Sequence, residues 1–148
     1  MKARVLTIAA LALLLLGFNE GCGGTYDATA SGVVTLDGQA VPRGTVTYHL
    51  ATGGAPAYSP IQTDGSYSVR TGREEGLPAG EYQVTITANE APAQLVSKNG
   101  GPMPAGKAIT PAWYRSKETS GLTFTVESGS NDINLELTSK PPAGWKPR

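Results

Sequence analysis

The sequence contains few of the residues that form covalent cross-links or metal sites. Cys22 is the only cysteine and His49 the only histidine in 148 residues. One cysteine cannot form an internal disulfide, so the fold must be stabilised by packing alone. One histidine cannot supply the several imidazoles of a typical zinc site. We therefore expect neither a disulfide framework nor a metal, and we predict that His49 lies on the outward side of a strand.

An excess of charge of one sign is also absent. Twelve Lys and Arg residues balance twelve Asp and Glu residues, whereas a nucleic-acid binder normally carries a basic excess. The motifs of common catalytic sites are missing too, because the chain has no Gly-x-Ser-x-Gly elbow, no His-Glu-x-x-His pair and no phosphate-binding loop. These absences predict a protein that is not an enzyme and has neither a cofactor nor a nucleic-acid partner.

No apolar run is long enough to cross a membrane as a helix. The longest covers residues 5–16, which is shorter than the roughly 20 residues that a spanning helix needs. Lys2 and Arg4 precede it, and a basic start followed by a short apolar core is typical of a signal peptide. The sequence therefore predicts that the protein is exported.

Cys22 follows this apolar run and the small residue Gly21. The arrangement resembles the lipid-attachment site of a bacterial lipoprotein, although Asn19 and Glu20 stand where an aliphatic and a small residue are usual. The resemblance implies acylation of Cys22, and two or more acyl chains hold a protein stably on a membrane. We therefore expect a membrane-anchored lipoprotein of the cell envelope, on its periplasmic or surface face.

This resemblance also divides the start of the chain. It implies a lipoprotein-type signal peptide at residues 1–21 and a tether at residues 22–27. Two alternatives remain open from the residues alone. Cleavage after Ala30, which ends a small-residue Ala-x-Ala motif, would release a free protein, and Cys22 would then be a discarded, unmodified thiol.

Apolar and polar residues alternate along most of the remaining chain, as in strands with one face in a core. The alternating runs are separated by glycine- and proline-rich stretches, among them a predicted loop at residues 51–60 and a turn at residues 128–131. Seven runs qualify as strands, at residues 31–36, 45–50, 61–63, 67–69, 82–88, 122–126 and 133–137. One apolar face on each strand requires a second sheet to cover it. We predict an all-β, seven-stranded β-sandwich with no helix longer than one turn.

Two glycine-containing turns shape this sandwich. Gly65 follows Asp64 in a tight-turn dipeptide that tolerates positive φ. Gly80 follows Pro78 just before the clearest strand, and Tyr82 comes two residues later. A tyrosine after such a corner resembles the tyrosine corner of Greek-key sandwiches, which implies a hydrogen bond from the Tyr82 hydroxyl to backbone a few residues upstream. We assign structural roles to Gly65, Gly80 and Tyr82.

Four segments in this order resemble the carboxypeptidase regulatory-like domain, at residues 32–48, 64–67, 76–84 and 120–126. The resemblance spans residues 28–138 and implies a transthyretin-like (prealbumin-like) Greek-key β-sandwich of the kind found in short bacterial lipoproteins. It also implies a non-catalytic accessory, adhesive or scaffolding role, although a shared fold does not transfer a function. The remaining residues, 139–148, are proline-rich and are predicted to form a flexible tail.

The connection at residues 89–121 is the best place for function, because it is far longer than ordinary loops. Trp113, Tyr114, Arg115 and Lys117 cluster near its end, and aromatic and arginine side chains often anchor interfaces. One interpretation is an interaction loop for an envelope protein or a glycan. A second is that the two aromatic residues fold back and cap an open end of the sandwich. A further alternative is a periplasmic carrier that binds a small ligand between this loop and the sheet ends.

Overall fold

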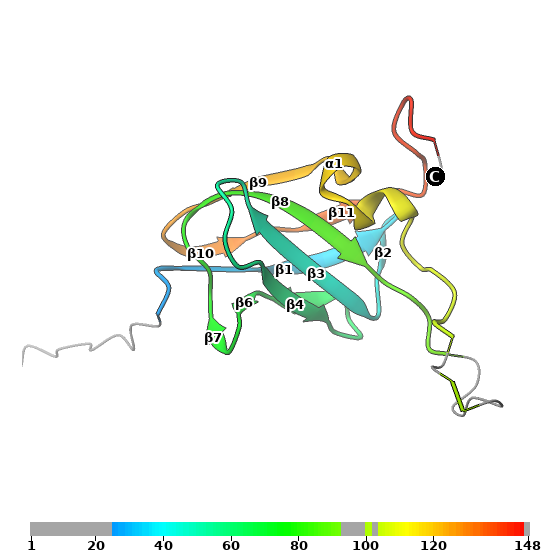
Figure 1. Ribbon diagram of the computed structural model, residues 1–148, viewed down its shortest axis with the longest axis horizontal. Helices are drawn as coiled ribbons and strands as arrows, with labels where there is room; N and C mark the ends of the chain where they lie inside the picture. Colours follow the sequence, from blue (N-terminus) through cyan, green and yellow to red (C-terminus); the bar gives the residue numbers. More distant parts are fainter. Residues whose placement is uncertain (1–24, 93–99, 102–103, 147–148) are drawn as a thin grey trace, which may run out of the picture.

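Two β-sheets pack face to face in the computed structural model, which describes residues 25–92, 100–101 and 104–146 (Figure 1). The expectation of an all-β sandwich is confirmed. The predicted signal peptide and Cys22 lie outside the described residues. Within them the only helices are two single turns, η1 (Ala112–Arg115) and α1 (Lys117–Ser120). Neither has the length or hydropathy of a membrane-spanning segment.

The larger sheet is antiparallel, with the strand order β7-β6-β4-β3-β8-β9. Its members are β3 (Gly44–Leu50), β4 (Ala57–Ile61), β6 (Arg70–Thr71), β7 (Glu74–Glu75), β8 (Gly80–Thr87) and β9 (Leu122–Val126). The long strands β3 and β8 form its centre, and both correspond to clear alternating runs of the sequence. The two edges are therefore β7 and β9.

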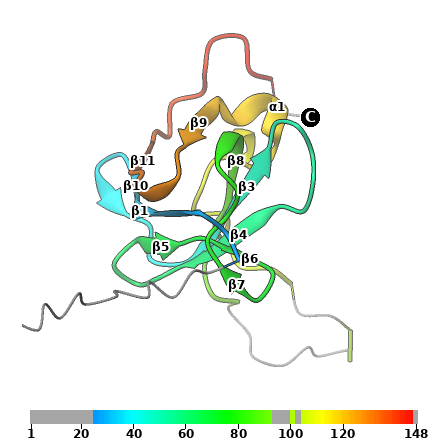
Figure 2. The same ribbon diagram turned by 90° about the vertical axis from the view of Figure 1, so that its left-hand side faces the viewer.

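The smaller sheet is built around β1 (Ala28–Leu36), as the view from the N-terminal side shows (Figure 2). On one side β1 pairs in parallel with β10 (Gly129–Asp132) and β11 (Leu135–Leu137). On the other side it pairs antiparallel with β2 (Gln39–Ala40) and β5 (Ser66–Ser68). The last strands of the domain thus lie beside the first, which ties its two ends together.

The core lies between the sheets, where alternate residues of each strand meet. Val46 and Tyr48 of β3 and Val84 and Ile86 of β8 are fully buried, and so is Leu135 of β11. Burying one large aliphatic side chain stabilises the fold by about 1.5–3 kcal/mol. The period-two pattern of the sequence therefore identified the packed face of the main strands.

The strands differ from the prediction mainly around β4 and β10, and of the predicted strand at residues 61–63 only Ile61 lies in a strand. Residues 57–61 form β4 inside the predicted loop, because Pro60 directs its missing N–H away from β3 and so costs no ladder bond. Residues 129–132 form β10 where a turn was expected, because their backbone pairs with β1 despite the polar side chains. The described chain contains eleven strands, not seven, because the two-residue strands β2, β6 and β7 were not predicted either.

The structure shows close backbone or side-chain approaches at Gly65 and Gly80 and a side-chain hydrogen bond at Tyr82. Gly65 has φ 85°, its carbonyl accepts from the Val34 N–H at 2.9 Å, and a Cβ there would lie 2.8 Å from the Val34 carbonyl oxygen. A Cβ on Gly80, which has φ 155°, would lie 2.9 Å from Leu50 Cδ1. The Tyr82 hydroxyl donates to the Pro78 carbonyl at 2.7 Å, which is the hydrogen bond of a tyrosine corner.

Candidate interaction surface

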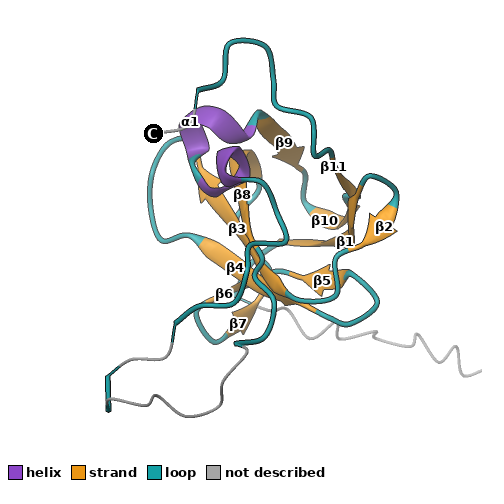
Figure 3. Cartoon of the chain, turned by 90° about the vertical axis from the view of Figure 1, so that its right-hand side faces the viewer, coloured by secondary structure: helices purple, strands orange, loops and turns teal. Residues whose placement is uncertain are grey.

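The aromatic residues of the predicted interaction loop are part of the core. Trp113 and Tyr114 lie in η1 with 7% and 5% of their surface exposed. The Tyr114 hydroxyl accepts the Thr138 N–H at 3.0 Å, and the Trp113 carbonyl accepts the Thr119 hydroxyl at 2.7 Å. Figure 3 shows η1 and α1 above the ends of the central strands. The structure therefore favours the second interpretation, in which these residues cap the sandwich.

The C-terminal segment joins this cap. Trp145 is half-buried, and its ring meets that of Trp113 edge-on, with ring centroids 4.9 Å apart. The Ser139 N–H donates to the Asp37 carboxylate at 3.0 Å. Hydrogen bonding from the Ser139 side chain, and then from its backbone, lowers the pKa of Asp37. The predicted flexible tail therefore has at least two contacts with the sandwich.

The charged members of the predicted loop remain at the surface. Arg115 and Lys117 are exposed, and the Arg115 guanidinium donates to the Asn89 side-chain oxygen at 3.1 Å. The structure thus separates the four predicted residues into two buried aromatic and two exposed cationic side chains. Sequence spacing placed them together, but only the second pair is accessible to a partner.

His49 lies on the outer face of the larger sheet, as predicted, but it is half-covered. Its Nε2 atom lies 3.1 Å from the Thr85 hydroxyl on the neighbouring strand β8. Burial, and to a smaller extent the charge of Lys117, lowers the pKa of His49, whereas Glu118 opposes the shift. The imidazole is therefore neutral at pH 7. In the described part of the chain, no cluster of three His, Cys, Asp or Glu residues suits a metal ion.

A buried pair of tyrosines links the two sheets. The hydroxyls of Tyr48 and Tyr67 are 2.8 Å apart, and Tyr67 donates to the Ile133 carbonyl at 2.6 Å. Because Tyr67 uses its proton on that carbonyl, Tyr48 must donate to Tyr67. Burial raises the pKa of Tyr48 to about 12 and that of Tyr67 still further. Both phenols are neutral and structural.

Tyr58 is an exposed aromatic residue that was not among the predicted site residues. It lies on β4 with 46% of its surface exposed, opposite Thr47 of β3 and Arg70 of β6. Directly opposed residues share a face of the sheet, so all three side chains lie on the outer face. In the sequence, the small residues Ala57 and Ser59 flank Tyr58, and this alternation could have indicated that Tyr58 faces outward. In the structure, both small residues are buried.

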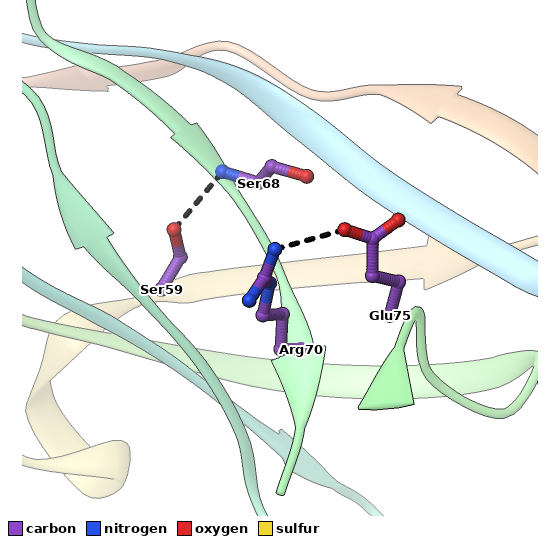
Figure 4. Close-up of polar contacts among 4 residues, drawn as sticks. All are labelled: Ser59, Ser68, Arg70 and Glu75. Atoms are coloured by element: carbon purple, nitrogen blue, oxygen red, sulfur yellow. Dashed lines mark hydrogen bonds and ion pairs between the residues drawn. The ribbon is translucent and has the colours of Figure 1, made fainter. Parts of the chain in front are cut away.

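A hollow of ≈ 430 Å³ lies next to the strand that carries Tyr58, where β4 and β5 separate. The strands diverge because β5 pairs with β1 of the other sheet. Ser59 bridges the gap, since its hydroxyl accepts the Ser68 N–H at 2.9 Å (Figure 4). The same hydroxyl donates to the Pro60 carbonyl. The hollow is lined by Ser59, Pro60, Gln62, Ser66, Tyr67, Ser68 and Arg70.

Arg70 joins this hollow to the Tyr58 face. One of its N–H groups donates to Glu75 at 2.8 Å, and both side chains are largely exposed (Figure 4). An exposed ion pair of this kind stabilises a fold by about 0–1 kcal/mol, so a ligand can replace it at small cost. We define the Tyr58 surface as Tyr58 together with the neighbouring hollow, which Gln62, Ser68 and Arg70 line.

A second hollow, of ≈ 530 Å³, lies where the chain leaves β8 for the long connection. Arg43 and Glu90 border it with opposite charges, and the Glu90 N–H donates to the Lys107 carbonyl at 2.7 Å. None of the four loop residues predicted from the sequence lines this hollow. It is therefore a separate candidate from both the cap and the Tyr58 surface.

No protein-family model matches the chain, and no curated protein matches it. We therefore infer the function from the surfaces of the molecule.

Proposed function

We propose that the protein is a non-catalytic lipoprotein of the cell envelope whose β-sandwich binds a glycan through the Tyr58 surface. One observation carries the proposal: an exposed aromatic ring stands on a rigid sheet face beside a hollow lined by hydroxyl, amide and guanidinium groups. Functional sites held by strands are positioned more accurately than sites on loops.

The chemistry of the Tyr58 surface suits a sugar ring. Tyrosine combines an apolar ring with a polar tip and is enriched at interfaces for that reason, and the apolar C–H face of a sugar can pack on it. Sugar hydroxyls both donate and accept hydrogen bonds. Ser68 and Gln62 offer both functions, and Arg70 supplies donors. The ligand would contact one aromatic ring and a few convergent polar groups, as is usual for small binding sites.

The envelope location is supported by the start of the sequence. The apolar run at residues 5–16, followed by Cys22, has the order of a lipoprotein signal. The first described residue is Thr25, so the tether between the acylated cysteine and the sandwich would be only a few residues long. The glycan is therefore expected to be one that lies close to the membrane.

The resemblance to the carboxypeptidase regulatory-like domain supports a non-catalytic role and a transthyretin-like, Greek-key connectivity. Such domains act as accessory, adhesive or scaffolding modules, and a glycan-binding sandwich belongs to that class. A protein partner at the same surface is the competing outcome. The two outcomes can be distinguished with the purified domain, because a glycan binder retains its binding activity without a second protein.

The test is a binding measurement with insoluble envelope polysaccharide and with an array of soluble oligosaccharides. Tyr58→Ala is expected to abolish binding, and Tyr58→Phe to retain most of it because the ring is preserved. Val33→Ala is the matched control, since Val33 is also an exposed large hydrophobic residue. Binding by wild type that Tyr58→Ala leaves unchanged, or binding to envelope protein but to no saccharide, would contradict the proposal. Mass spectrometry of the native chain tests the anchor, and a start at Ser31 without lipid would refute it.

A second candidate is a periplasmic carrier, favoured by the hollow of ≈ 530 Å³ between the sheet end and the long connection. Arg43 and Glu90 together suit a small zwitterionic ligand. A specific ligand in excess stabilises the folded state by mass action, so thermal shift with a panel of amino acids is the test. A shift that Arg43→Ala removes and Tyr58→Ala leaves intact would favour the carrier over the glycan binder.

A further inference from the structure

The two edges of the larger sheet are protected to very different degrees. The β7 edge is two residues long, and both Glu74 and Glu75 are charged and exposed. The β9 edge is five residues long and contains no charged residue and no proline. Short strands, charges and prolines are the usual means by which proteins prevent edge-to-edge pairing. Only the β7 edge has them.

The register of the sheet shows which backbone groups of β9 face outward. The Ala51 N–H donates to the Glu81 carbonyl at 2.8 Å, so the backbone groups of Glu81 point toward β3. Neighbouring residues of a strand point their groups in opposite directions. The backbone N–H and C=O groups of Tyr82 therefore point toward β9, where Tyr82 pairs with Phe124. It follows that the N–H and C=O groups of Thr123 and Thr125 point away from the sheet.

This open edge has defined ends. Glu127 points the same way, but its N–H donates to the Asn131 side-chain oxygen at 2.9 Å and its carbonyl accepts from the Asn131 amide at 2.7 Å. At the other end, Gly121 has φ 65° and terminates α1, so it is not extended. In the described chain, no hydrogen bond from outside β8 reaches the backbone of Thr123 or Thr125. The accessible edge is therefore confined to these two threonines and Phe124 between them.

We propose that this edge pairs with the same edge of a second copy of the chain, so that the larger sheet continues across a twofold axis. With the axis at Phe124, Thr123 of one copy lies opposite Thr125 of the other, and the two pairs make four backbone hydrogen bonds. A register centred on Thr125 would need hydrogen bonds from the backbone of Glu127, whose N–H and C=O groups are already bonded to the Asn131 side chain. A register centred on Thr123 would use Gly121, whose backbone is left-handed. Only the register centred on Phe124 engages both threonines.

The side chains of β9 suit pairing with a copy of themselves. Thr123 and Thr125 are both exposed on the outer face, and cross-strand threonine pairs are favourable. Leu122 and Phe124 are half-buried at the mouth of the sandwich and would gain cover from the second copy. No like charges meet, and the whole chain has a formal net charge of zero. The pairing is also closed, since each copy has one such edge and uses it once.

The inference does not depend on the proposed function. β9 forms one edge of the larger sheet, whereas Tyr58 and Arg70 lie on β4 and β6 toward the other. A glycan on the Tyr58 surface and a second copy on β9 can therefore bind together. Acylation of Cys22 would promote pairing by holding the copies on one surface, because confinement raises their effective concentration.

Cysteine cross-linking tests both the pairing and its register. The test uses residues 22–148, which contain the whole buried core, with Cys22→Ser. Opposed residues of an antiparallel pair have Cα atoms about 4.5–5.5 Å apart, within the range of a disulfide. Thr123→Cys mixed with Thr125→Cys should therefore form about tenfold more linked dimer under mild oxidation than either variant alone. Thr125→Cys mixed with Gln83→Cys, which lies on the same face of the inner strand β8, is the control and should form little.

Sedimentation provides the second measurement. Wild type should show a concentration-dependent dimer, and Thr125→Pro should be monomeric, since proline removes an outward N–H that the sheet does not use. Circular dichroism checks that this variant is folded; if it is not, the cross-linking result alone decides. A wild type that stays monomeric at its highest soluble concentration overturns the inference. So does a folded Thr125→Pro variant that still dimerises, or cross-linking that is as strong in the unmixed variants or the control.

Discussion

The capped end of the sandwich and the Tyr58 surface contain the same kinds of residue in opposite environments. At the capped end, Trp113 and Tyr114 are buried beneath the C-terminal segment, with Trp145 packed on Trp113. On the outer face of the larger sheet, Tyr58 is 46% exposed and Arg70 lies beside it. Aromatic residues near arginine therefore stabilise the fold in one region and are free to contact a partner in the other.

Residue type alone does not decide between a structural and a contact role. Trp113 and Tyr114 are adjacent in a single 3-10 turn, and both rings fit into the open end of the core. Tyr58 lies on a strand whose alternate residues Ala57 and Ser59 face the core instead. Period-two geometry therefore directs Tyr58 outward. An aromatic ring belongs to the cap if other segments cover it, and it belongs to a contact surface if it stays exposed.

The largest expected effect comes from removing the two rings that define this comparison. Trp113→Ala should lower the free energy of unfolding by about 3–5 kcal/mol, as for other buried large aromatic residues. Tyr58→Ala should change it by less than about 0.5 kcal/mol, as for other surface changes. Urea unfolding followed by circular dichroism measures both. Equal losses in the two variants would show that the regions do not differ as the burial suggests.

A substitution at Ser59 tests whether the Ser59 hydroxyl stabilises the strands that form the Tyr58 surface. Ser59→Ala removes the acceptor of the Ser68 N–H, and losing a partly buried hydrogen bond of this kind costs about 0.5–1.5 kcal/mol. Ser68→Ala is the matched control, since that side chain is exposed and its loss should cost less than about 0.5 kcal/mol. Chemical denaturation of the two variants decides the point, and an unchanged midpoint for Ser59→Ala would contradict it.

Two tyrosine hydroxyls form hydrogen bonds whose contributions to stability can be compared. Tyr82→Phe removes the bond to the Pro78 carbonyl, and Tyr114→Phe removes the acceptor of the Thr138 N–H. Each should lower stability by about 1 kcal/mol, the usual net contribution of a hydrogen bond. Thermal unfolding of both variants is the measurement. A Tyr82→Phe variant as stable as wild type would refute the tyrosine corner.

The smallest expected effect is a pH dependence that arises from His49 on the outer face of the larger sheet. Burial lowers the pKa of His49 in the folded state, so the unfolded chain binds the proton more readily. The stability that this contributes is present above the unfolded pKa of about 6.5 and is lost as the pH falls below it. His49→Gln should therefore flatten the stability profile between about pH 6.5 and pH 5. A wild type and a variant with parallel profiles over that interval would contradict the assignment.

Much of the fold could be predicted because period-two alternation is a local signal. The runs at Val46 to Tyr48 and Tyr82 to Ile86 indicated their buried faces directly, and the Pro78 corner indicated the role of Tyr82. The strands β4 and β10 were missed for physical reasons. Pro60 normally argues against a strand, and β10 has no apolar face because its pairing with β1 is made by backbone groups.

The candidate site was less predictable, because exposure depends on neighbours that are distant in sequence. Trp113 is covered by Trp145, and Tyr58 is flanked by Arg70, which reaches it only after the chain has turned back. No local pattern contains either contact. The cluster at residues 113–117 was therefore predicted as one surface, whereas the structure buries its two aromatic side chains and leaves the two cationic ones exposed.

The sequence by itself determined that this protein is a β-sandwich stabilised by packing, because alternation and a single cysteine are properties of the chain alone. Only the tertiary structure decided which aromatic residues are covered and which sheet edge is open. Those outcomes depend on how Gly65 lets the chain cross between the sheets and on where the two sheets end. Both are set by pairings between segments that no short stretch of sequence contains.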